Sequence, residues 1–90
     1  MKQLQRIFKV LGNPRRLAMV RLLLQRKELS VGTIAQAMQL SLTATSRHLN
    51  ALANHDLLEK RQESTTAYYR IASGGAPDTE TVLRLIAQKR

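Results

Sequence analysis

Residues 31–52 read VGTIAQAMQLSLTATSRHLNAL and hold two short amphipathic patterns separated by a tight turn. Ser30 is placed to cap a first helix, and Ser41 is placed to cap a second. The apolar stripe of the first pattern consists of Val31, Ile34, Ala35 and Met38. One face of the second carries Thr45, His48, Leu49 and Leu52. Two short helices joined in this way predict a helix-turn-helix unit over about residues 31–53.

The opposite face of the second helix carries short hydrogen-bonding side chains and one arginine. Its members are Thr43, Ser46, Arg47 and Asn50. In the major groove of DNA an arginine can pair with guanine and an asparagine with adenine, and a carboxylate is absent from this face. The pattern therefore predicts a surface that reads double-stranded DNA. An ordinary solvated helix face is the alternative.

The length and composition of the chain restrict the classes of protein it can belong to. Ninety residues predict one domain, 1–90, and the absence of cysteine excludes disulfides and thiolate metal ligands. No apolar segment has the length of a signal peptide or a membrane span, so we expect a cytoplasmic chain without membrane contact. We find no nucleophile with a base, no glycine-rich phosphate loop and no paired carboxylates, and so expect neither an enzyme nor a cofactor.

The positive charge is concentrated at the start of the chain. The formal net charge is +9, and residues 1–30 hold eight lysines and arginines against the single acidic residue Glu28. Such a cluster attracts a polyanion, and phosphate contacts supply most of the sequence-independent affinity for DNA. We interpret the cluster as a nucleic-acid footprint, with solvated helix faces as the alternative.

Outside the helix-turn-helix, the sequence predicts further helices and a hairpin. Helices are expected at about 3–11, from Pro14 to about Arg26, and at about 78–88, with a linker over residues 73–77. Two short strands around a polar turn predict a β-hairpin at about 57–72, with Tyr69 facing the core. The expected fold class is mainly α, a winged helix-turn-helix of about five helices plus a two-stranded wing.

Five segments, spread over nearly the whole chain, match a known family in order and spacing. They are Leu11 to Leu17, Glu28 to Val31, Leu40-Ser41 through Ser46 to Leu49, Leu57-Leu58, and Tyr68 to Ile71. With this set of segments the sequence resembles the ArsR/SmtB-type bacterial repressors. The resemblance implies a sequence-specific homodimeric repressor on a pseudo-palindromic operator, relieved by a signal.

Carried over position by position, the resemblance and the helical geometry give a set of DNA-binding residues. On the helix these are Leu42, Thr43, Ala44, Ser46, Arg47, His48 and Asn50, and on the wing Arg61, Gln62, Thr65 and Thr66, with Arg70 beside them. Leu42 stands where a polar residue is expected, and it either touches a thymine methyl group or is partly exposed. Gln39 stands where the turn usually has glycine, which predicts a left-handed residue at a cost of about 1 kcal/mol. Glu63 at the wing tip would face phosphate unfavourably.

No sensory metal site is expected. Ser30 and Gly32 stand where the metal-binding members of the family carry cysteines, and the last helix offers Asp78 and Glu80 but no histidine. His48 is expected to be a partly buried side chain that bonds backbone or phosphate. The signal is therefore expected to differ from cysteine-bound metal.

The terminal helices carry more apolar surface than a small monomer can hide, so we expect them to pair across a two-fold axis. The predicted dimer interface comprises Leu4, Ile7, Phe8, Leu11, Val82, Leu85 and Ile86. Packing of both helices on their own core is the alternative. Two means of regulation are open. The protein either binds a small molecule between the dimerising helices, or it has no inducer site and is controlled by a partner or by its abundance. The rival function is a winged-helix protein interaction module without specific DNA binding.

Overall fold

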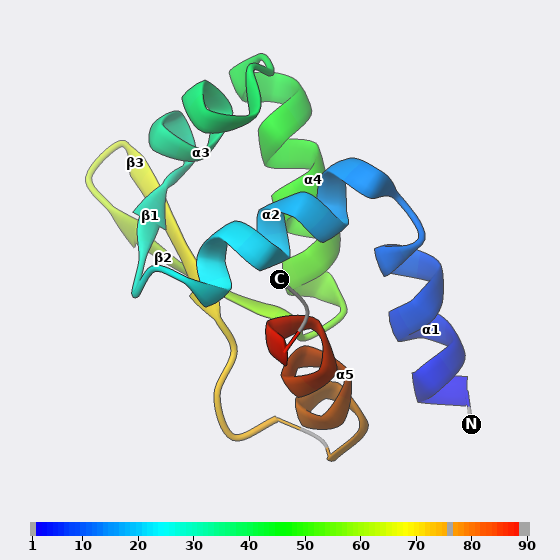
Figure 1. Ribbon diagram of the computed structural model, residues 1–90. Helices are drawn as coiled ribbons and strands as arrows, with labels where there is room; N and C mark the ends of the chain where they lie inside the picture. The colour runs from blue at the N-terminus through cyan, green and yellow to red at the C-terminus, as the bar shows by residue number, and fades with distance from the viewer. Residues whose placement is uncertain (1, 76, 89–90) are drawn as a thin grey trace.

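The computed structural model describes residues 2–75 and 77–88, which form five helices and a three-stranded antiparallel sheet (Figure 1). Ala76, part of the predicted linker, and residues 1, 89 and 90 lie outside the described residues. The elements in order are α1 (Lys2–Leu11), α2 (Pro14–Leu24), β1 (Leu29–Ser30), α3 (Val31–Met38), α4 (Leu42–Asn54), β2 (Leu58–Glu63), β3 (Thr66–Ile71) and α5 (Pro77–Gln88). The predicted winged helix-turn-helix fold is confirmed.

Side-chain caps fix the starts of three helices. The Asn13 side chain accepts from the backbone N–H groups of Arg15 and Arg16 at 2.9 and 3.3 Å, and Pro14 opens α2. Ser30 and Ser41 cap α3 and α4 as predicted, each accepting from the backbone N–H three residues later. The expected end of α2 near Arg26 is too late, because α2 stops at Leu24 and the chain turns into β1.

The turn between α3 and α4 has the left-handed residue that the sequence predicted. Gln39 has φ 57° and ψ 44°. The backbone N–H of Leu40 donates to the carbonyl of Ala35 at 3.0 Å, and the N–H of Gln39 donates to that of Gln36 at 3.3 Å. These two bonds make a Schellman ending, which satisfies the last carbonyls of α3 and sets the angle at which α4 leaves.

The sheet has one strand more than the two-stranded wing that the sequence predicted. β1 pairs with β3 at Leu29↔Tyr69 and Ser30↔Tyr68, and β2 pairs along the other edge of β3. A strand of two residues is too short to show alternation in the sequence. Ser30 is both the last residue of β1 and the N-cap of α3, so it connects the sheet that contains the wing to the helix-turn-helix.

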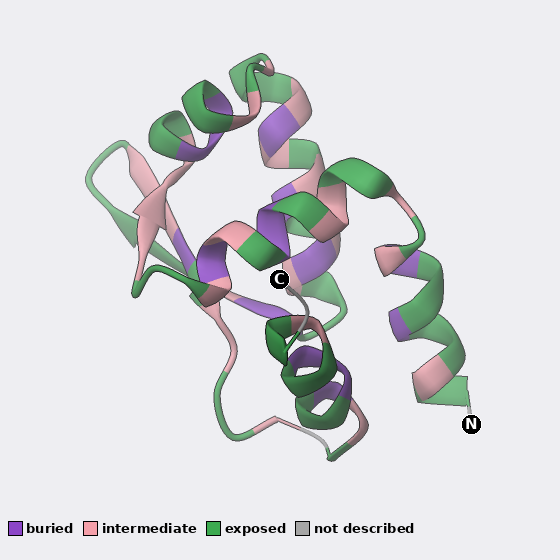
Figure 2. Cartoon of the chain, viewed as in Figure 1, coloured by how far each residue is buried: buried purple, intermediate pink, exposed green. Residues whose placement is uncertain are grey.

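The core lies between the helices and the sheet, where the buried segments of Figure 2 face one another. Its largest buried side chains include Ile7, Met19, Leu23, Ile34, Leu49, Leu52, Leu57 and Tyr69. The terminal helices differ from prediction. α1 buries Ile7 and Val10 but leaves Phe8 58% exposed, and α5 buries Val82 and Leu83 but leaves Leu85 58% exposed. Ile7 and Val82 therefore belong to the core of this chain and not to a free surface.

Candidate nucleic-acid interface

One face of α4 is buried and the other is open to solvent. Thr45, Leu49 and Leu52 are fully buried, and they anchor the helix to the core. The open side, here called the recognition face, consists of Leu42, Thr43, Ala44, Ser46, Arg47 and Asn50. Leu42 is 59% exposed, Thr43, Arg47 and Asn50 are exposed, and Ala44 and Ser46 are half-buried. The structure thus brings these six predicted residues together on one surface.

The orientation of Asn50 is set by a residue of the wing. The buried hydroxyl of Tyr69 on β3 donates to Oδ1 of Asn50 at 2.7 Å. Burial raises the pKa of Tyr69, which keeps the phenol protonated as a donor. The sequence predicted that Tyr69 lies in the core, and this is confirmed. Its hydrogen bond to Asn50 was not predicted, because the two residues are 19 positions apart and no local sequence pattern indicates the contact.

His48 lies at the flank of α4 and contacts α2. It is half-buried, and Nε of Arg16 donates to its Nδ1 at 3.2 Å. Burial lowers the pKa of His48, and the positive charges of Arg16, Arg15 and Arg47 lower it further. The neutral ring therefore accepts a hydrogen bond from Arg16, and this bond connects α4 to α2.

The wing holds Arg61, one of its two predicted arginines, in an ion-pair network. Nη2 and Nε of Arg61 donate to the two carboxylate oxygens of Glu28 at 2.8 and 3.1 Å, and Nη1 donates to Glu63 at 3.3 Å. The guanidinium also lies 4.5 Å from the centre of the Tyr68 ring. The hydrogen bonds from Arg61 hold the pKa of Glu28 below its usual value. Arg61 is therefore engaged with the protein, and Glu28 is its sequence-distant partner.

The other predicted wing residues lie around the β2–β3 turn. Gln62 donates from Nε2 to the carbonyl of Ser64 at 3.3 Å, Thr65 is exposed, and Thr66 is half-buried at the start of β3. Arg70 is exposed and pairs with Glu59 at 2.9 Å. The two threonines and Gln62 therefore lie with Ser64 and Glu63 at the tip of the wing.

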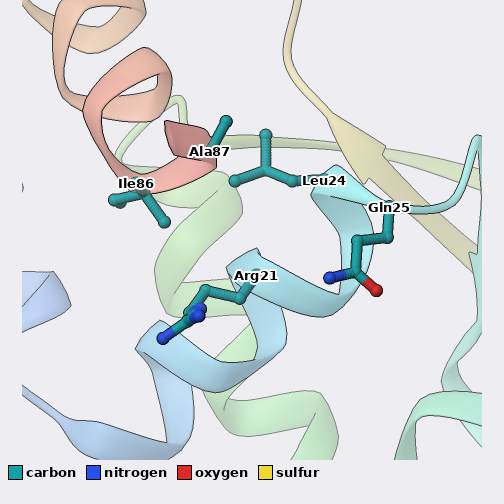
Figure 3. A pocket seen from close by; sticks show the side chains of 5 residues that line it. All are labelled: Arg21, Leu24, Gln25, Ile86 and Ala87. Atoms are coloured by element: carbon teal, nitrogen blue, oxygen red, sulfur yellow. The ribbon is translucent and has the colours of Figure 1, made fainter. Parts of the chain in front are cut away.

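The hollow between α2 and α5 is small. It is lined by Arg21, Leu24, Gln25, Ile86 and Ala87, and Figure 3 shows Leu24 of α2 facing the end of α5 across it. Its volume of about 70 Å³ is well below the roughly 300 Å³ at which small-molecule pockets begin. In the described part of the chain, no group of three or more histidine, cysteine, aspartate and glutamate side chains could hold a metal ion.

Comparison with known proteins gives the family. Residues 11–61 match the family described as a helix-turn-helix domain. The HTH-type transcriptional regulator Rv0324 of Mycobacterium tuberculosis is 44% identical over 85 residues, which span 94% of this chain and 34% of that protein. The NMR structure of the homodimeric winged helix-turn-helix DNA-binding domain of Mb0332 from Mycobacterium bovis, a possible ArsR-family regulator, has a TM-score of 0.78 and 40% identity, with 94% of this chain and 75% of that chain covered.

The chain belongs to the ArsR-type winged helix-turn-helix family. This family is one of transcriptional regulators. A second relative, the transcriptional activator HlyU of Vibrio cholerae, is 37% identical over 67 residues, covering 74% of this chain and 61% of HlyU. The chain thus spans about a third of Rv0324 and three fifths of HlyU. None of the helices described for this ArsR-type chain is long and apolar enough to cross a membrane.

Proposed function

We propose that this ArsR-type regulator binds DNA as a homodimer and represses transcription from a pseudo-palindromic operator. One observation carries the proposal. The recognition face of α4 is largely exposed and mostly polar, with Leu42 as its exposed apolar side chain, and it carries no carboxylate, while Thr45, Leu49 and Leu52 on the opposite face are fully buried. A helix held in this way can enter the major groove with its N-terminal half, as recognition helices do.

The proposed base contacts come from side chains that the protein does not use elsewhere. Thr43, Ser46 and Arg47 make no side-chain hydrogen bond or ion pair within the described ranges. Arg47 is proposed to pair with a guanine, and Leu42 to lie against a thymine methyl group. Asn50 offers an amide already oriented by Tyr69. His48 is proposed to support these contacts rather than to make one.

The wing is proposed to add backbone contacts that do not select sequence. Gln62, Thr65 and Thr66 can donate to phosphate oxygens. Arg61 is occupied by Glu28 and Glu63, so we assign it to holding the wing in position and not to DNA. The basic residues of α1 and α2 supply the long-range attraction.

The homodimer is proposed to form through the exposed apolar side chains of the terminal helices. Phe8 and Leu85 are both 58% exposed, on helices that pack against each other, with Leu4, Leu11 and Ile86 half-buried beside them. The Mb0332 domain is homodimeric, which supports a homodimer here. Ile7 and Val82 are buried in the core of this chain, so the proposed interface does not include them.

The family resemblance implies that this protein represses transcription. The relative HlyU is named as a transcriptional activator, so the test has to distinguish repression from activation. Because the chain has no cysteine, the signal that relieves repression is proposed to differ from cysteine-bound metal. The second candidate function is a protein interaction module. It is favoured by Leu42, which is 59% exposed and could anchor a partner.

Fluorescence anisotropy on DNA from upstream of the gene, against a scrambled duplex of equal length, tests the proposal. We expect the upstream duplex to stay bound at physiological salt while the scrambled duplex is released. A reporter driven by the same DNA should lose expression when the protein is produced. Equal, salt-labile binding to both duplexes would favour the interaction module, and increased reporter expression would make the protein an activator.

A further inference from the structure

A hollow lined by four basic side chains lies beside α4 and away from the recognition face. It is formed by Arg6, Lys9 and Val10 of α1, Arg16 of α2 and His55 at the end of α4. Its volume is about 380 Å³, and none of the described residues that line it is acidic. We call this feature the basic hollow. Three separate elements therefore bring positive or ionisable nitrogen groups to one concave place.

The positive lining continues along α1. Lys2, Arg6 and Lys9 are spaced on one face of the helix, and with Gln5 they line an adjoining hollow of about 410 Å³. A third hollow, also next to Arg6 and His55, contains the one acidic neighbour, Asp56. Lys2, Arg6 and Lys9 form no ion pair among the described residues. Their charges repel one another, and Asp56 forms no ion pair with any of them in the described structure, which favours a bound anion.

Two members of the basic hollow are oriented by bonds already made within the protein. Nε of Arg16 is used by His48, which leaves the terminal guanidinium nitrogens free to bind a ligand. Nδ1 of His55 donates to the carbonyl of Ala51 at 2.8 Å, which fixes the orientation of the ring at the edge of the hollow. Both side chains are thus partly oriented before any ligand arrives.

We propose that the basic hollow is a binding site for an oxyanion of the phosphate class. Guanidinium groups match phosphate oxygens in pairs, and lysine adds a point charge. The phosphate group belongs either to a free phosphorylated molecule or to the DNA backbone beside α4. In both cases the same basic side chains of the hollow would bind its oxygen atoms. Through Arg16 and His48, the anion would be connected to the helix that carries the recognition face.

Titration of the DNA-free protein with inorganic pyrophosphate tests the site independently of the proposed function. At constant ionic strength, we expect saturable changes in the ¹H–¹⁵N NMR signals of α1, the start of α2 and His55. Replacing Arg6 and Lys9 together by glutamine should weaken this binding by about tenfold or more, since two charged contacts are lost. The matched control is R26Q with K27Q, which removes the same charge from exposed positions outside the hollow. It should change the affinity less than about twofold.

A second measurement distinguishes the two sources of the phosphate. If DNA occupies the hollow, the R6Q/K9Q variant should lower the salt dependence of DNA binding by about one to two phosphate contacts. If a free anion occupies it, that salt dependence should stay unchanged while pyrophosphate binding is lost. The proposal is overturned if pyrophosphate causes no saturable change, or if the R6Q/K9Q and R26Q/K27Q variants weaken its binding equally.

Discussion

The hydroxyl of Tyr69 donates to Oδ1 of Asn50 across 2.7 Å, joining the buried side of the wing to the exposed side of α4. The bond holds the amide in one orientation, with its N–H groups and the remaining lone pair of Oδ1 left for a ligand. A polar side chain oriented in advance loses less conformational entropy when it binds. The wing therefore contributes to the recognition face through its core residue as well as through its tip.

Replacement of Tyr69 by phenylalanine should lower the free energy of unfolding by about 0.5 to 1.5 kcal/mol, because one intramolecular hydrogen bond is lost. Chemical denaturation measures the change. The control is Tyr68→Phe, since the neighbouring Tyr68 has no hydroxyl bond in the described structure, and it should change stability by less than about 0.5 kcal/mol. Equal effects at the two positions would argue against the Asn50 bond as the cause.

Arg47→Ala should weaken specific DNA binding by about 1 to 3 kcal/mol without changing the thermal melt. Arg47 is exposed, and no bond to it would be lost within the described chain. Anisotropy on the upstream duplex measures the loss. Arg26→Ala removes the same charge from the exposed loop after α2 and should have a smaller effect. If wild type and Arg47→Ala bind the duplex alike, Arg47 does not read a base.

Stability should fall at mildly acidic pH because of His48. Burial, followed by the charges of Arg16, Arg15 and Arg47, holds its pKa below the ordinary value of 6.5. The unfolded chain then binds the proton more readily, so the free energy of unfolding falls as pH drops from 6.5 through the folded-state pKa. Above 6.5 this effect is absent.

Thermal melts between pH 8 and pH 5 measure this dependence. His48→Gln should remove its part of the fall, since glutamine can still accept from Arg16 and does not titrate. His55→Gln, which changes the other histidine, should keep the part that is due to His48. A His48→Gln variant that loses stability as steeply as the wild type would show that another group is responsible.

Phe8→Asp should shift the protein from dimer to monomer. Burial of a large apolar side chain contributes roughly 1.5 to 3 kcal/mol, so the dissociation constant should rise by more than about tenfold. Sedimentation at micromolar concentration measures the mass. Leu42→Asp is the matched control, because Leu42 is 59% exposed but lies on the recognition face, and its variant should remain dimeric. A wild-type monomer at these concentrations would contradict the proposed interface.

Gln39→Gly should raise the free energy of unfolding by about 0.5 to 1 kcal/mol, because glycine adopts a left-handed backbone without the Cβ penalty. Gln36→Gly, within the regular part of α3, should lower it by a similar amount. Denaturant titration of both variants measures the two signs. A destabilised Gln39→Gly protein would show that the Gln39 side chain contributes more than its backbone costs.

The sequence predicted most of the fold because the deciding signals are local. Ser30 and Ser41 as caps, Pro14 as the first helical residue and the left-handed Gln39 were each read from a few neighbouring residues, and the structure confirms all four. Strand β1 was missed because its two residues are too few for a pattern. The sequence pattern placed Ile7 and Val82 on a free surface, whereas both are buried in the core of this chain. Which side of a terminal helix is covered depends on residues that are distant in the sequence.

The recognition face was likewise predictable from helical geometry, because exposure on α4 alternates with the spacing of Thr45, Leu49 and Leu52. Its supporting contacts were not. The bond from Arg16 to His48 joins residues 32 positions apart, and that from Arg61 to Glu28 joins residues 33 apart. A local sequence pattern does not predict which polar side chains will form contacts across such distances in the chain.

The fully buried Thr45, Leu49 and Leu52 have a consequence for how such a protein can be altered. They fix α4 without any help from Thr43, Ser46 and Arg47, whose side chains make no bond within the described ranges. These three positions can be randomised as a library while the scaffold is kept constant. On the proposed function, variants with new operator preferences can then be selected by changing the codons of three residues, while the residues that determine folding stay the same.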